Sequence, residues 1–195
     1  MLKTWFEAFP HFPFPHQLAF LIDNPIRRRL LADPVRIIDS LALTGSERVL
    51  ELGPGSGFFT LEIARRLPDG QLTLFDIQPE MLDKARPKLD RAGYRNVSFH
   101  SGDASRGLPF PDSSFDVAYL AAVLGEVSDR PACIGSLARV LKPGGLLVFF
   151  EQFPDPDRMS VQKLRELAEA DRFGFLDADS TWWRDIVRFR RLPDP

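Results

Sequence analysis

The chain has 195 residues, 44% of them hydrophobic, which is enough for one domain with a substantial core. Its 25 basic and 27 acidic side chains nearly cancel, so it lacks the broad positive field typical of nucleic-acid binding, and no nucleic-acid partner is expected. Cys133 is the only cysteine, which excludes an intrachain disulfide and fits a reduced, cytoplasmic setting. No apolar run is long enough for a transmembrane segment, and three prolines interrupt the amino terminus, unlike a secretory signal.

The amino-terminal residues are rich in phenylalanine and proline, and we expect residues 1–30 to form a leader and helix ahead of a main domain at 31–195. The aromatic positions of this leader are Phe6, Phe9, Phe12, Phe14 and Phe20. The rings either pack on the outside of the first helices or belong to a lid that closes over a bound ligand and excludes water. Trp182 and Trp183 are candidates to line the same opening.

A helix follows the leader and is predicted from Pro34 to Leu43, with Asp33 as its N-cap. Its apolar positions fall on one face, so we expect it to pack on the sheet edge. These positions are Val35, Ile38, Leu41 and Ala42.

Strand-like and helix-like runs alternate from Arg48 to Phe150, which predicts an α/β fold with a doubly wound, Rossmann-like parallel sheet and helices on both faces. The five strands are predicted at Arg48–Leu52, Gln71–Asp76, Val97–Ser101, Phe115–Leu120 and Leu146–Phe150. The helices between them are predicted at Phe58–Leu67, Glu80–Ala92 and Arg130–Val140. Asp129 marks the start of the third helix, and Pro87 is expected to kink or shorten the second.

The carboxyl-terminal part is predicted to complete the fold. A helix is expected over Ser160–Arg172, with Gly174 at its end. Two further runs, Phe175–Ala178 and Ile186–Arg190, are typical of a final strand pair.

The run Val49–Phe59 is the most informative segment, because an apolar strand ends in Glu51 and is followed by Gly53, Gly55 and Gly57. Such a turn leaves the first N–H groups of the next helix unpaired, and the missing Cβ atoms let a ligand approach the backbone. The spacing is G-x-G-x-G and not the G-x-G-x-x-G of dinucleotide-binding sites, which disfavours a nicotinamide-dependent oxidoreductase. An ordinary tight turn is the alternative.

Three further segments follow in order, and together with Glu51–Gly57 they resemble the class I S-adenosylmethionine-dependent methyltransferases. The segments are Leu74–Leu82, Gly102–Asp116 and Arg139–Gly145. The resemblance covers roughly Leu30 to Arg190 and lies nearest to the small ubiquinone/menaquinone-biosynthesis type. It implies a seven-stranded, mainly parallel sheet with an antiparallel last strand, S-adenosyl-L-methionine as cofactor, and methyl transfer to a small, apolar acceptor.

The location of Asp76, about twenty residues beyond the glycine turn at a strand end, suits a carboxylate that accepts hydrogen bonds from a ribose diol. Its alternative role is a helix N-cap. By resemblance, the Asp103 carboxylate and the Ala104 N–H would bind adenine, and Ile77 would lie on one face of the ring. A plain Asx turn is the alternative for Asp103, and plain core packing is the alternative for Ile77.

The resemblance places Glu51 and the three glycines around the methionine portion and ribose, and Leu120 and Ala121 beneath the methyl donor. Transfer from a sulfonium needs chiefly in-line positioning, with a base only where the acceptor must lose a proton. Glu126 is the candidate base, and capping or solvating the next helix is its alternative. Many relatives of this type carry paired histidines where this chain has Gly125 and Glu126, which weakens a specific assignment to quinone precursors.

The remaining polar residues provide no metal site, because one cysteine and three scattered histidines lack the required ligand count. His100, within a predicted strand, is expected to be structural. The two remaining functional alternatives are a non-catalytic S-adenosylmethionine-binding module or partner subunit and, less favoured, an NAD(P)-dependent oxidoreductase. The sequence indicates no oligomeric state.

Overall fold

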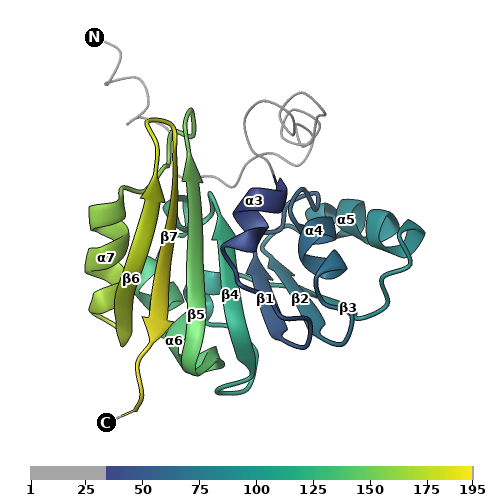
Figure 1. Ribbon diagram of the computed structural model, residues 1–195, viewed down its shortest axis with the longest axis horizontal. Helices are drawn as coiled ribbons and strands as arrows, with labels where there is room; N and C mark the ends of the chain where they lie inside the picture. The colour runs from purple at the N-terminus through teal and green to yellow at the C-terminus, as the bar shows by residue number, and fades with distance from the viewer. Residues whose placement is uncertain (1–33, 195) are drawn as a thin grey trace.

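The computed structural model describes residues 34–194, which form a seven-stranded sheet between two layers of helices (Figure 1). The predicted leader at 1–30, its phenylalanines and the Asp33 cap lie outside the described residues. The packing of the leader, its alternative as a lid, and the division at residue 30 stay predictions.

The strand order is β3-β2-β1-β4-β5-β7-β6, and every neighbouring pair is parallel except those that involve β7. The predicted fold class is confirmed, including the antiparallel last strand. The strands are β1 Arg48–Leu52, β2 Gln71–Asp76, β3 Val97–Ser101, β4 Phe115–Ala121, β5 Leu141–Gln152, β6 Phe173–Ser180 and β7 Arg184–Arg191.

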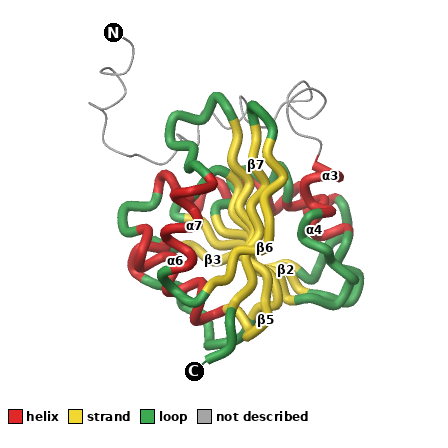
Figure 2. Tube along the Cα trace, turned by 60° about the vertical axis from the view of Figure 1, so that its left-hand side comes forward, coloured by secondary structure: helices red, strands yellow, loops and turns green. Residues whose placement is uncertain are grey.

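The central strands are apolar on both faces because helices cover both sides of the sheet. One apolar cluster joins the sheet to α3 Pro34–Asp39, α4 Thr60–Arg65 and α5 Pro79–Arg91. The other joins the opposite face to α6 Arg130–Val140 and α7 Val161–Glu169. Figure 2 shows the sheet in yellow with α6 and α7 on one side and α3 and α4 on the other.

The helices on the first face differ from the prediction, and α4 is four residues shorter than the predicted Phe58–Leu67. The helix that starts at Pro34 ends at Asp39 and not at Leu43, because Ala42 takes a left-handed φ of 50°. Val35 is 44% exposed and not on the packed face, and Ile37 and Ile38 contact the sheet face and not its edge. Helix α5 continues through Pro87 to Arg91, so the expected shortening at Pro87 is wrong.

The second half of the fold shows longer strands than expected. Strand β5 begins at Leu141, five residues early, because Leu141 pairs with Phe115 before the register shift in β4. Helix α7 is one turn shorter than predicted, and Arg172, with φ 65°, takes the left-handed position expected of Gly174, which lies inside β6. Helix α6 matches its predicted bounds, and Asp129 caps it by accepting the Ala132 N–H at 3.0 Å.

Cys133 is fully buried in the second apolar cluster. Between residues 34 and 194, no helix is long and apolar enough to cross a bilayer. His100 is exposed on edge strand β3, and its ring contacts Phe110 edge-on at 5.1 Å.

Candidate functional site at the carboxyl edge

The predicted ligand-binding segments all lie at one edge of the sheet, where the parallel strands end, which we call the carboxyl edge. Backbone hydrogen bonds continue the pairing of the strands into these loops. Gly53 N donates to Phe75 O at 2.8 Å, Gly102 N to Asp76 O at 3.0 Å, and Ala122 N to Phe150 O at 2.8 Å. The loops after β1, β2, β3 and β4 are therefore held side by side, as a ligand crevice of an open α/β sheet requires.

The three glycines of the loop Gly53–Gly57, the glycine loop, are each in the left-handed region, with φ of 67°, 54° and 87°. A Cβ on Gly53 would lie 2.4 Å from Val123, and one on Gly57 would lie 3.2 Å from Ala85 in α5. Among residues 34–194, no atom lies within 4 Å of a Cβ placed on Gly55. Gly53 and Gly57 therefore allow close packing of protein on protein, whereas Gly55 presents backbone that no described residue covers.

Asp76 ties the glycine loop to the end of β2. Its two carboxylate oxygens accept the Gly55 N–H at 3.2 Å and the Gln78 N–H at 2.9 Å, and the residue is only 6% exposed. Burial raises the pKa of this carboxyl, although the backbone bonds to Gln78 and Gly55 oppose the shift. Gln78, not Asp76, is the N-cap residue of α5, so the alternative of a helix cap for Asp76 is wrong.

Glu51, the last acidic residue of β1, is 2% exposed, and its Oε2 atom has no hydrogen-bond partner among residues 34–194. Burial, reinforced by the nearby Asp76 carboxylate, raises the pKa of Glu51 to about 8 from an ordinary 4.5. A buried carboxyl with an unused oxygen is costly in a protein interior. Such a group suits a cationic or hydrogen-bond-donating ligand.

The three remaining predicted residues on the loops after β2 and β3 differ in how exposed they are. Ile77 is 49% exposed directly after β2, so the plain core reading of this side chain is wrong. Asp103 forms the Asx turn that was its alternative, because Oδ1 accepts the Ser105 N–H at 2.9 Å and the Ser105 hydroxyl at 2.6 Å. These hydrogen bonds lower the pKa of Asp103. Ala104 begins the short 3-10 helix Ala104–Arg106 and is buried.

Of the two residues expected beneath the methyl donor, the structure brings only one near the surface. Leu120 is fully buried in the apolar cluster on the α6 face, so its side chain presents no surface to a ligand. Ala121 is half-buried at the end of β4. The following Ala122 has an unusual left-handed φ of 56°, and nothing in its residue type indicated this turn.

Glu126 is half-buried at the end of the 3-10 helix Leu124–Glu126. It does not cap α6, because Asp129 does. The space around the neighbouring Gly125 does not admit a histidine at position 125, because a Cβ there would lie 2.0 Å from the Asp157 carbonyl oxygen. The loop that follows β5 therefore occupies the space that a side chain at position 125 would need.

Sequence reasoning missed a group of charged residues at the end of β5. Glu151 is 1% exposed, its Oε2 accepts the Met159 N–H at 3.0 Å, and burial raises its pKa to about 8. Asp185 lies opposite it on β7 and pairs with Arg158 at 2.6 Å. The sequence pattern could have indicated Glu151, since this residue follows an apolar run as Glu51 does. Within the described range, no cluster of three or more histidine, cysteine or acidic side chains is arranged to hold a metal.

Residues 49–145 match a protein family described as "Methyltransferase domain". A curated relative from Shewanella halifaxensis, named "Ubiquinone/menaquinone biosynthesis C-methyltransferase UbiE", is 39% identical over 132 residues, which cover 67% of this chain and 52% of the relative. A protein of the same name from Teredinibacter turnerae is 39% identical over 123 residues, covering 62% and 49%. The chain thus spans about half the length of the curated relatives it matches.

Among solved structures, one titled "SAM dependent methyltransferase" from Aquifex aeolicus aligns with a TM-score of 0.85 and 22% identity, over 92% of this chain and 100% of that chain. Another, titled "[4+2]-Cyclase SpnF", aligns with a TM-score of 0.74 and 22% identity, over 82% and 79%. At this level of identity the likeness shows the fold alone.

Proposed function

Residues 49–145 belong to the class I S-adenosylmethionine-dependent methyltransferase family, and from this premise we propose that the protein transfers a methyl group from S-adenosylmethionine to a small, apolar acceptor. The family and its cofactor, both expected from the sequence, are confirmed by the matches. The activity and the acceptor are the proposal. The names of the curated relatives support a carbon atom as the methylated position.

The observation that carries the proposal is the glycine loop, whose central residue Gly55 has no described residue against its Cβ position while its N–H donates to Asp76. The residues present fit the cofactor. Gly55 offers backbone without a side chain, Asp76 has acceptor oxygens for a ribose diol, and the unused Oε2 of Glu51 can accept a hydrogen bond from an amino group. Ile77 offers an exposed apolar surface for a flat ring.

The chain's residues act mainly by positioning. When bound, S-adenosylmethionine supplies an electrophilic methyl group on a sulfonium that departs as a neutral thioether, so no oxyanion hole is needed. Restricting the motion of two reacting groups contributes roughly 7 to 11 kcal/mol to lowering the barrier. Asp103, through a remaining lone pair, and Ala104 are proposed to select adenine, Ala121 to lie beneath the methyl group, and Glu126 to accept a proton where the acceptor must lose one.

Calorimetry with S-adenosylhomocysteine, followed by an acceptor panel assayed for S-adenosylhomocysteine release, tests the proposal. We expect binding and turnover with apolar acceptors. Binding with no turnover on any acceptor would favour a non-catalytic binding module, because this fold, shared with the [4+2]-cyclase SpnF, does not by itself establish methyl transfer. The absence of binding would exclude both, and binding of NADH instead would favour the oxidoreductase.

The Asp76→Asn variant tests the site itself. Because a hydrogen bond to a charged group contributes about 1.5 to 3 kcal/mol, we expect S-adenosylhomocysteine affinity to fall about 10- to 100-fold. Asp116→Asn is the matched control, since Asp116 also accepts a backbone N–H, from Arg48 at 2.9 Å, at the start of β4. Equal affinity losses in both variants would contradict the assignment.

A further inference from the structure

Arg184 is the first residue of β7 and lies at the carboxyl edge, although it belongs to none of the family motifs. It pairs with Gln152, the last residue of β5. Strand side chains alternate between faces, so Arg184 shares a face with Ile186, which belongs to the apolar cluster with α3, α4 and α5. Arg184 therefore lies on the same face as the helices that follow the glycine loop and β2.

The guanidinium of Arg184 is incompletely paired. Its Nη2 donates to Asp179 Oδ2 at 3.0 Å, and the Asp179 side chain in this ion pair is 62% exposed. Its Nη1 is buried and has no hydrogen-bond partner among residues 34–194. Arginine presents five donors in a planar fork, and a buried donor without an acceptor costs free energy. The unused nitrogen indicates a missing acceptor oxygen.

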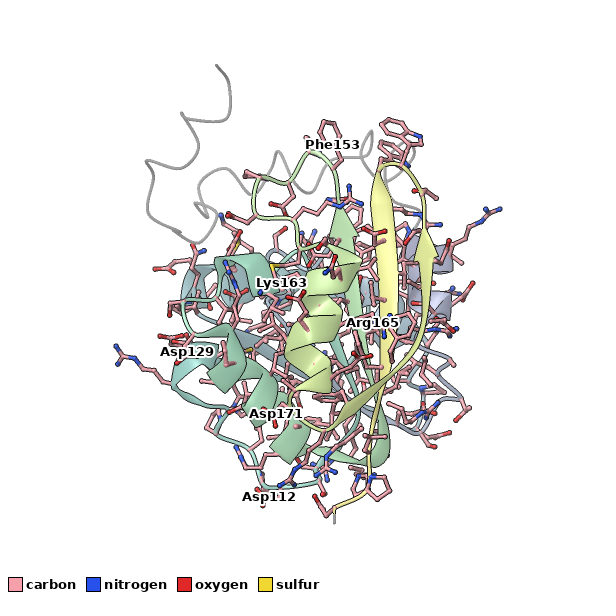
Figure 3. All side chains as sticks on the ribbon, turned by 90° about the vertical axis from the view of Figure 1, so that its left-hand side faces the viewer. Asp112, Asp129, Phe153, Lys163, Arg165 and Asp171 are labelled. Atoms are coloured by element: carbon pink, nitrogen blue, oxygen red, sulfur yellow. The ribbon has the colours of Figure 1, made fainter. Side chains whose placement is uncertain are left out.

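Aromatic side chains surround this end of the sheet. Trp182 and Trp183, in the turn before Arg184, stack with ring centroids 5.3 Å apart, and Trp182 is 83% exposed. Phe153, on the loop after β5, is 57% exposed, and its N–H donates to Trp183 O at 2.7 Å. Figure 3 shows Phe153 at the end of the molecule beside the tip of the β6–β7 hairpin. Large exposed aromatic rings are the usual contact surface for planar apolar molecules.

We propose that Arg184 binds a carboxylate of the methyl acceptor, while the exposed ring of Trp182, two residues before it, contacts the apolar body. This inference rests on the proposed function and specifies the acceptor as a planar apolar acid. A carboxylate matches the guanidinium fork in geometry and charge, which a neutral carbonyl does not. Asp179 balances the guanidinium from the solvent side and leaves Nη1 for the ligand.

The test uses the full chain and two probes that differ only in charge, 2-naphthoate and 2-naphthamide, with binding followed by tryptophan fluorescence. We expect naphthoate to bind more tightly than naphthamide. Arg184→Met should weaken naphthoate about 10- to 100-fold, as expected for the loss of a charged hydrogen bond, and leave naphthamide unchanged. Asp179→Asn is the matched control, because it breaks the same ion pair and keeps the cation. It should leave naphthoate affinity unchanged or raised.

A purely structural role for the ion pair predicts the opposite, namely that both variants weaken both probes alike. A weakening of both probes by both variants would overturn the inference. Equal binding of the two probes to the unaltered protein, or no binding of either probe, would also overturn it. S-adenosylhomocysteine affinity, measured in parallel, separates this outcome from failure of the proposed function. A variant that retains its affinity for S-adenosylhomocysteine and its melting temperature is folded. If the unaltered protein does not bind S-adenosylhomocysteine, the methyltransferase proposal is rejected instead.

Discussion

Gly53 and Gly55 have the same backbone conformation and different surroundings. The requirement for glycine therefore has a different physical origin at each of these two residues. Both have φ in the left-handed region, where a Cβ costs roughly 1 to 2 kcal/mol. Only Gly53 also faces a neighbour, since its Cβ would meet Val123 at 2.4 Å. The glycine loop thus has one position where folding requires glycine and one where only the proposed cofactor would require it.

We expect Gly53→Ala to destabilise the fold by more than the backbone cost alone, about 3 kcal/mol or more, because overpacking adds to the strain. Gly55→Ala should cost only about 1 to 2 kcal/mol in stability and lower S-adenosylhomocysteine affinity by a larger factor. Urea denaturation and calorimetry on the same samples measure the two effects. A Gly55→Ala variant with unchanged cofactor affinity would exclude Gly55 from the site.

The site was predictable from sequence only in part, and the reason is visible at single residues. Glycine spacing located the loop, because glycine tolerates left-handed backbone at no steric cost. Ala122 and Arg172 also take left-handed conformations, and nothing in their residue types indicates it. Likewise the unpaired Nη1 of Arg184 depends on what the hairpin places around it. Local chemistry can be predicted from sequence, whereas such positions are set by tertiary contacts.

At the scale of elements, the helix termini show which capping signals the structure uses. Asp129 and Ser160 each accept a backbone N–H of the helix that they begin, at 3.0 Å and 3.2 Å. Gln78 is the N-cap of α5 and makes no such side-chain bond. Helix α5 starts with Pro79, whose ring suits the first helical position.

Asp129→Ala and Ser160→Ala should each lower the free energy of unfolding by about 0.5 to 2 kcal/mol, the usual cost of a lost N-cap. Asp129→Asn and Ser160→Thr are the matched controls and should change it by less than about 0.5 kcal/mol, because both new side chains can still accept the N–H. Chemical denaturation of the four variants provides the comparison. Effects of the controls as large as those of the alanine variants would contradict this account of the caps.

The number and order of strands were predictable because the apolar runs alternate with helical patterns, but strand ends were not. Strand β5 extends back to Leu141 because Phe115 provides a pairing partner, and Gly145 passes close to the Asp116 carbonyl, where a Cβ would lie at 3.0 Å. Strand length therefore depends on the neighbouring strand, which a single run of sequence does not reveal.

At the scale of the whole molecule, Glu51 and Glu151 are two buried carboxyls at the ends of β1 and β5, each with its pKa raised to about 8 by burial. In the unfolded chain a glutamate loses its proton near 4.5. Between these values the folded protein keeps a proton that the unfolded chain has lost. The resulting stabilisation is fully present below pH 4.5 and is lost as the pH rises to about 8.

We expect the free energy of unfolding to decrease between about pH 5 and pH 8, by up to about 1.4 kcal/mol per pH unit for each carboxyl. Glu151→Gln should flatten this decrease while its amide oxygen still accepts the Met159 N–H, and Glu51→Gln should do so independently. Urea denaturation across the pH range measures the slopes. Profiles that run parallel to that of the unaltered protein would show that these carboxyls are ionised when folded.

The reversed direction of β7 determines which of its residues lie at the carboxyl edge. Because this strand runs against the other six, its beginning and not its end meets their tips, and the chain turns back there through a short hairpin. Insertions or substitutions in that hairpin would change the surroundings of Arg184 while β1 and β2 keep their register. Sequence changes can thus accumulate at this end of β7 without disturbing the glycine loop.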